Sequence, residues 1–285
     1  ACDRVGKPYF REEVTDRLAH PVWMVEREIP AGMFGLTAYE RMHEHNAPAT
    51  IYIEGDGLLT ADFRMESKNP TPRNPVSLHL ATKDKSENLA WIARPCQYYG
   101  IEGCDPAFWG QKRFSPEVLN GYNLALDEMK KRYDIKGFHL VGFDGGGAIA
   151  ALLAAERNDI LSLRTVAATL DTNIYASENK IAPLTGSLNP VDVASKLTGL
   201  PQTHYIGGQD KIISPAALHS YLQALGPSNC VQYRFIQEAE HEQGWVEKWP
   251  ELLAALPTCT GPVEEIDFQP MPEPFIIQPE TPDKK

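Results

Sequence analysis

Residues 138–150 read Phe138-His139-Leu140-Val141-Gly142-Phe143-Asp144-Gly145-Gly146-Gly147-Ala148-Ile149-Ala150, and this stretch decides the fold. A short apolar run enters a cluster of glycines, and a second apolar run of small residues leaves it. The order predicts a buried strand, a sharp turn that presents the side chain of Asp144, and a buried helix. Gly142 and Gly146 stand two positions on either side of Asp144, where a Cβ would clash with a strained turn.

Two kinds of site place a glycine-rich turn between a strand and a helix. A phosphate-binding loop is disfavoured here, because no lysine follows the glycines and the carboxylate of Asp144 would repel a phosphate. The remaining interpretation is a nucleophile elbow, the turn on which many hydrolases carry a serine. In this chain Asp144 takes the place of that serine.

The composition is that of one large α/β domain with extensions. The chain has 285 residues, of which 42% are hydrophobic and 23% are charged, so it can bury a sizeable core. A formal net charge of −11 without a cluster of Lys and Arg argues against nucleic acid as a partner. The longest apolar stretch, residues 148–155, is far too short to span a bilayer. We expect neither a cofactor nor a metal.

Strand and helix patterns alternate along the chain. We expect a hairpin within 21–42, strands at 49–53, 89–93, 138–143, 163–170, 203–206 and 231–236, and helices at 76–81, 116–133, 145–157, 215–225 and 244–256. This alternation predicts a mostly parallel sheet with helices on both faces. Residues 171–200 show one short amphipathic helix, at 191–197, and are otherwise loop, so we interpret them as a short lid.

The chain divides into an N-terminal segment (1–20), an α/β domain (21–260) and a C-terminal tail (261–285). The tail holds six prolines among Glu and Asp, a composition typical of disorder. Phe268 and Phe275 leave open a second interpretation, in which part of the tail lies extended on the domain.

Five cysteines favour an oxidising compartment. Cys96 and Cys104 bracket a short loop that can close on itself, which favours a disulfide over two free thiols or a zinc site. Cys230 opens a strand and Cys259 follows the last helix, so a second disulfide is expected between them. Cys2 is then left over. It is either a lipidation site at the membrane or an unpaired thiol. Because the chain opens at Ala1 without a methionine, removal of a leader is an expectation of ours.

Two further polar groups follow buried strands. Asp210 comes after the strand at 203–206, and His241 comes after the strand at 231–236. The order elbow, acid, histidine is that of the catalytic triad in α/β-hydrolases, so we expect Asp144, Asp210 and His241 to converge. Asp171, after the strand expected at 163–170, is the competing candidate for the acid.

A glycine-rich turn upstream of the elbow completes the expected site. The strand at 49–53 runs into Glu54-Gly55-Asp56-Gly57, where the second donor of an oxyanion hole usually lies. We expect the backbone N–H groups of Asp56 and Gly145 to point at a developing oxyanion. The alternative is a simple tight turn.

From about residue 48 to 258 the chain resembles an α/β-hydrolase, and more narrowly a bacterial exported, lipoprotein-like branch of that superfamily. The resemblance lies in 51–57 (IYIEGDG), 71–75, 93–104, 142–155, 187–191 (SLNPV) and 241–245. It implies an esterase of the Ser-His-Asp type for a small-molecule or lipid-like ester, with the serine at position 144. It also implies export to the periplasm, the outer membrane or the medium.

Asp144 leaves three hypotheses open. The first is an esterase or lipase scaffold whose activity is reduced or altered, because aspartate attacking an ester would form a high-energy anhydride. The second is a hydrolase with an Asp nucleophile, as in haloalkane dehalogenases and epoxide hydrolases. Gly145 stands where dehalogenases usually have a tryptophan, and the thirty residues of the lid are too few for an epoxide hydrolase cap. The third is a binding protein that keeps the pocket without catalysis.

Overall fold

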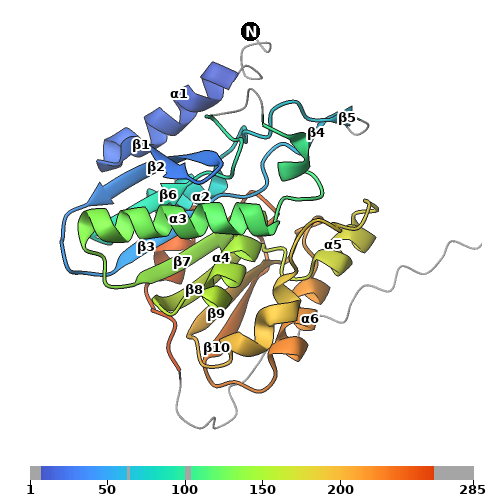
Figure 1. Ribbon diagram of the computed structural model, residues 1–285. Helices are drawn as coiled ribbons and strands as arrows, with labels where there is room; N and C mark the ends of the chain where they lie inside the picture. The colour runs from blue at the N-terminus through green and yellow to red at the C-terminus, as the bar shows by residue number, and fades with distance from the viewer. Residues whose placement is uncertain (1–7, 63–64, 100–103, 260–285) are drawn as a thin grey trace, which may run out of the picture.

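One eight-stranded sheet organises the chain in the computed structural model, which describes residues 8–62, 65–99 and 104–259 (Figure 1). The strand order is β1-β2-β6-β3-β7-β8-β9-β10. β2 pairs antiparallel with β1 and β6, and the other neighbours in the sheet pair parallel. The strands are β1 (Val25–Ala31), β2 (Phe34–Met42), β3 (Ala49–Ile53), β6 (Asn88–Ile92), β7 (Phe138–Phe143), β8 (Ile160–Val166), β9 (Gln202–Gly207) and β10 (Val231–Ile236). The mostly parallel sheet predicted from the sequence is confirmed.

Helices follow most of the strands. They are α1 (Pro8–Ala19), α2 (Val76–Ala81), α3 (Pro116–Tyr133), α4 (Gly145–Glu156), α5 (Thr172–Glu178), α6 (Pro215–Leu225) and α7 (Trp249–Leu253), with 3-10 turns η2 (His20–Val22), η3 (Pro106–Phe108) and η4 (Pro190–Leu197). A separate ribbon pairs β4 (Thr60–Asp62) with β5 (Met65–Glu66). Among the described residues, no helix is both long enough and apolar enough to cross a membrane.

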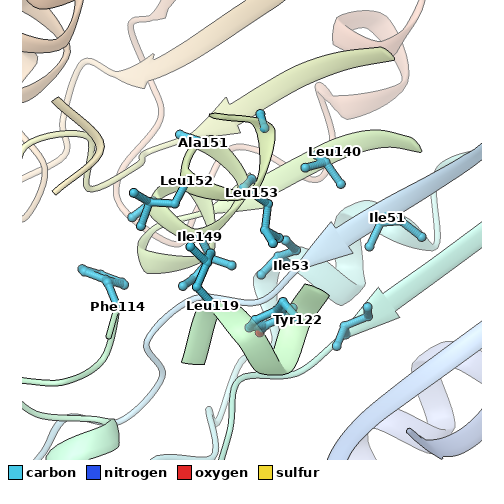
Figure 2. Packing of buried hydrophobic residues seen from close by; sticks show 14 of the residues in the cluster. Ile51, Ile53, Phe114, Leu119, Tyr122, Leu140, Ile149, Ala151, Leu152 and Leu153 are labelled. Carbon is cyan, nitrogen blue, oxygen red and sulfur yellow. The ribbon is translucent and has the colours of Figure 1, made fainter. Parts of the chain in front are cut away.

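Two hydrophobic clusters cover the two faces of the sheet, because successive side chains of a strand point to opposite sides. In β3, Ile51 and Ile53 belong to the cluster under α3 and α4, whereas Tyr52 belongs to the cluster under α2 and α7. Figure 2 shows the first cluster, in which Ile149 and Leu153 of α4 lie among residues from the sheet and α3. Helices therefore cover both faces of the sheet, as the sequence predicts.

Several element boundaries differ from the prediction. The strand expected at 163–170 is β8, which spans Ile160–Val166 and ends four residues earlier. The helix expected at 244–256 shrinks to α7, Trp249–Leu253. The lid contains α5 in addition to the helical turn expected at 191–197. Part of the N-terminal segment forms α1, and the tail from 261 lies outside the described residues.

Candidate active site

The turn between β7 and α4 presents Asp144. Its backbone is in the positive-φ region (φ 50°, ψ −123°). A residue other than glycine adopts this conformation only with backbone strain. The N–H of Asp144 donates to Val166 O at 3.0 Å, and its carbonyl accepts from the N–H groups of Gly147 and Thr169. A Cβ on Gly146 would strike the carbonyl oxygens of Ile53 and Glu54 at the end of β3. The glycines thus allow a tight elbow to pack against the neighbouring strand.

Asp210 and His241 lie beside the elbow, each in the loop after a strand, β9 and β10 respectively. His241 Nδ1 is 3.0 Å from Asp210 Oδ2, and His241 Nε2 is 3.7 Å from Asp144 Oδ1. The other carboxylate oxygen of Asp210 accepts the N–H groups of Ile212 and Ile213, which fixes the side chain. The structure brings together the three residues that the sequence proposes as a triad.

Asp171 has a different role. Its Oδ1 accepts the N–H groups of Asn173 and Ile174, and so caps the N-terminus of α5. Its Oδ2 accepts a hydrogen bond from Ser220 Oγ at 2.6 Å. The carboxylate of Asp171 is thus held by the lid helix and α6, and His241 contacts Asp210 instead.

The two expected oxyanion donors point at Asp144 itself. The N–H of Asp56 donates to Asp144 Oδ2 at 2.9 Å, and the backbone N–H of Gly145 lies close enough to the carboxylate to oppose the rise of its pKa. The side chain of Asp144 is 10% exposed. Asp144 Oδ2 therefore accepts the hydrogen bond that the N–H of Asp56 would otherwise give to a substrate oxygen.

A buried charge cluster lies behind the turn that carries Asp56. Arg94 Nη1 is 2.7 Å from Asp56 Oδ1, and Arg113 Nη1 is 2.9 Å from Asp56 Oδ2. All three side chains are at most 6% exposed. Neither arginine is among the site residues predicted from the sequence. A usable signal was present at Arg94, which directly follows the buried strand at 89–93, next to the Asp56 turn in the sheet order.

The titratable groups of the site perturb one another. Burial alone would lower the pKa of His241, but the hydrogen bond to Asp210 and the charges of Asp144, Asp210 and Glu242 outweigh it and raise that pKa to about 9. Burial and the charge of Asp56 raise the pKa of Asp144 to about 6, against the opposing effects of His241 and the two backbone N–H groups. At neutral pH the site therefore holds an imidazolium beside a carboxylate.

Two disulfides tie the chain together. They join Cys96 to Cys104 and Cys230 to Cys259, the two pairings expected from the sequence. Cys2 lies outside the described residues. Among the described residues, no group of three or more His, Cys, Asp or Glu side chains could hold a metal ion.

Comparisons with known proteins identify the fold. No family model and no curated protein matches the sequence. Among solved structures, an esterase of Pyrococcus furiosus aligns with a TM-score of 0.58 at 12% identity, covering 81% of this chain and 90% of that one. Est1E from Butyrivibrio proteoclasticus aligns with a TM-score of 0.57 at 16% identity, covering 80% of this chain and 95% of that one. An acylaminoacyl peptidase of Pyrococcus horikoshii aligns with a TM-score of 0.56 at 11% identity, covering 80% of this chain and 39% of that one. The chain has the α/β-hydrolase fold.

Proposed function

We propose that this protein is a hydrolase of the esterase type, acting on a carboxylic ester or related acyl substrate, with Asp144 at the nucleophile position and turnover reduced for that reason. The proposal is carried by the arrangement of three side chains: His241 lies between Asp144 and Asp210 and contacts both carboxylates. The N–H of Asp56 donates a hydrogen bond to the Asp144 carboxylate. Esterases among the compared structures support the same reaction class.

A serine at position 144 would complete the chemistry. Its Oγ would attack the ester carbon and pass its proton to His241 Nε2, while Asp210 holds the other ring nitrogen. The substrate oxygen would accept hydrogen bonds from the N–H groups of Asp56 and Gly145. Asp144 opposes this sequence in three ways. Its Oδ2 accepts the hydrogen bond from Asp56 that a substrate oxygen would need. Its charge adds to the hydrogen bond of Asp210 in raising the pKa of His241, and its attack on an ester would give an anhydride.

Restoring the serine tests the proposal. We expect Asp144→Ser to hydrolyse p-nitrophenyl esters of short or medium chains and to react with a fluorophosphonate probe, whereas the natural chain and Asp144→Ala stay near background. Removing a serine nucleophile costs about 10⁶ in rate, so even a partial restoration of about 100-fold would be plain. An Asp144→Ser/His241→Gln variant is the matched control and should lose the gain. An inert, well-folded Asp144→Ser protein would contradict the proposal.

A second candidate is a hydrolase in which Asp144 is itself the nucleophile toward saturated carbon. It is favoured by the position of Asp144 Oδ2, because the carbonyl oxygen of an alkyl-enzyme ester would accept the same hydrogen bond from the N–H of Asp56. Tyr175 of the lid helix α5 is also near: burial, and after it the charge of Asp144, raise the pKa of Tyr175. Against it, a Cβ at Gly145 would clash with Asp56, so no halide-binding tryptophan fits there.

Single turnover in H₂¹⁸O separates the two candidates. An Asp nucleophile incorporates ¹⁸O into the Asp144 carboxylate in the presence of a haloalkane or epoxide, and releases halide or diol. An esterase scaffold with a blocked nucleophile gives neither. If neither the natural chain nor Asp144→Ser turns over any of these substrates, a non-catalytic binding protein becomes the first interpretation.

We also propose that the protein is exported. The two disulfides support an oxidising compartment. Cys2 remains the proposed point of membrane anchoring, which mass spectrometry of the protein from its native membranes would detect as a lipid adduct.

A further inference from the structure

The Asp56 side chain is held on both of its oxygens by two arginines. Arg94 binds Oδ1 and Arg113 binds Oδ2, and all three side chains are almost wholly buried. A further Nη of Arg94 donates to the carbonyl of Arg113, and Arg113 Nε donates to Gly110 O at 2.8 Å. The cluster therefore joins the loop after β3, the end of β6 and the segment before α3.

A contribution to the stability of the fold does not by itself explain why these three charged side chains are buried together. Burying ions costs several kcal/mol each, and well-packed apolar residues often serve a core as well as a buried ion pair. The cluster also carries two guanidinium groups against one carboxylate, which leaves a net positive charge. That charge lies beside the backbone N–H of Asp56, the group that contacts Asp144 Oδ2 at 2.9 Å.

The same cluster leaves room only for glycine at position 145, directly after Asp144. A Cβ on Gly145 would strike Asp56 Oδ1 and approach Arg94 Nη1 to 2.8 Å. The carboxylate clamp thus packs directly against the second oxyanion donor. Both expected donors, Asp56 and Gly145, are in contact with the buried cluster.

We propose that Arg94 and Arg113 are positioning residues of the oxyanion hole: they fix the direction of the Asp56 N–H and supply a buried positive charge that stabilises the developing oxyanion. This inference rests on the proposed esterase function. The substrate oxygen receives its hydrogen bonds from the backbone, and the arginines act through Asp56 without touching the substrate. In the Asp144 chain, Asp144 adds to Asp56 in raising the pKa of Arg113, whereas the charge of Asp56 acts in the opposite sense and raises the pKa of Asp144.

Kinetics of variants in the Asp144→Ser background test the proposal. We expect Arg113→Gln to lower kcat by about 10- to 100-fold with KM changed less than about threefold, because one oxyanion donor is typically worth 10²–10³ in rate. Arg113→Lys keeps the positive charge, so its kcat should lie between that of Arg113→Gln and that of the Asp144→Ser parent. We expect Arg94→Lys to lower kcat to a similar extent as Arg113→Lys. Arg157→Gln is the matched control, since Arg157 pairs with Asp159 and Asp127 beyond the far end of α4, about 18 Å along the helix. It should lose stability without losing kcat.

A second measurement keeps the inference testable if Asp144→Ser is inert and the esterase proposal fails. His241 can be titrated by NMR in the natural Asp144 chain, where it faces Asp144, Asp210, Glu242 and the ring of Phe143. Removing the charge of Arg113 should raise the pKa of His241 by about 0.5 unit or more, and Arg157→Gln should not move it. Unchanged kcat in a folded Arg113→Gln protein, or an unchanged His241 titration, would overturn the inference.

Discussion

Asp144 is one side chain whose two oxygens meet two different parts of the site. Oδ2 accepts the N–H of Asp56, and Oδ1 lies 3.7 Å from the imidazole of His241. A serine has a single oxygen, which would leave the N–H groups free for substrate and let the histidine act as a base. The change of one residue therefore alters the protonation of the base as well as the identity of the nucleophile.

The Asp144–His241 pair predicts a stability that depends on pH. The pKa of His241 is raised from 6.5 to about 9 in the folded protein, so its contribution is fully present below pH 6.5 and is lost as the pH rises through 9. Asp144, with a pKa of about 6, is ionised across that window and supplies part of the attraction. We expect the free energy of unfolding to fall by up to about 3 kcal/mol between these two pH values.

Urea unfolding at pH 6.5 and pH 9 measures this difference. In Asp144→Ser the hydrogen bond and the charge of Asp210 remain and still raise the pKa of His241, but the charge of Asp144 is gone, so the fall should be smaller. His241→Gln has no titrating group at position 241, so its fall between the two pH values measures the contribution of all other titrating groups. Equal falls in the natural chain and in Asp144→Ser would show that the carboxylate does not support the imidazolium.

At the scale of elements, helices with a clear start signal were predicted well. Ser115 and Pro116 predict the start of α3, and in the structure Ser115 Oγ accepts the N–H of Val118. The same reasoning applied to Asp171 would have found α5, because Asp171 caps that helix with its side chain.

Strand and helix ends near the site were predicted less well, for physical reasons. The apolar run continues past Val166, but Ala167 has φ 46° and is buried in the turn beside the elbow, so apolarity there reflects burial and not a strand. Gly244 has φ 85°, which prevents a helix from starting there. Trp245 Nε1 donates to the carbonyls of Glu240 and His241 and ties down the loop that carries the histidine.

The cap of α3 gives a prediction at this scale. Ser115→Ala removes the acceptor for the N–H of Val118 and should lower the free energy of unfolding by about 1 kcal/mol. Ser177→Ala, at an exposed position inside α5, is the comparison and should change it by less than about 0.5 kcal/mol. Chemical denaturation followed by circular dichroism measures both. A cost at position 115 no larger than at 177 would show that the cap contributes nothing.

For the whole molecule, the sequence predicts the order of the site residues but not the charges that support them. The triad candidates each follow a strand, so their meeting at one edge follows from the topology. The clamp on Asp56 joins residues 38 and 57 positions apart, and nothing in the local pattern around Arg113 indicates its partner. Such a contact depends on how three loops pack, which the periodicity of single elements does not encode.

The two disulfides act on the whole chain to different extents. Cys96–Cys104 spans a sequence separation of 8, and Cys230–Cys259 spans 29. In the chain-entropy treatment a longer closed loop removes more freedom from the unfolded state, about 2.6 kcal/mol for the first and about 3.6 kcal/mol for the second. The second also fastens the segment after α7 to the start of β10, at the edge of the sheet.

We therefore expect the double variant Cys230→Ser/Cys259→Ser to lose more stability than Cys96→Ser/Cys104→Ser, by about 1 kcal/mol. Thermal or urea unfolding of the two variants, compared with the oxidised and the reduced unsubstituted chain, measures the difference.

The short disulfide lies next to Arg94, so its loss should lower kcat in the Asp144→Ser background more than loss of the long one. The reverse order in both measurements would mean that the loop 96–104 stabilises the fold and leaves the oxyanion turn unaffected.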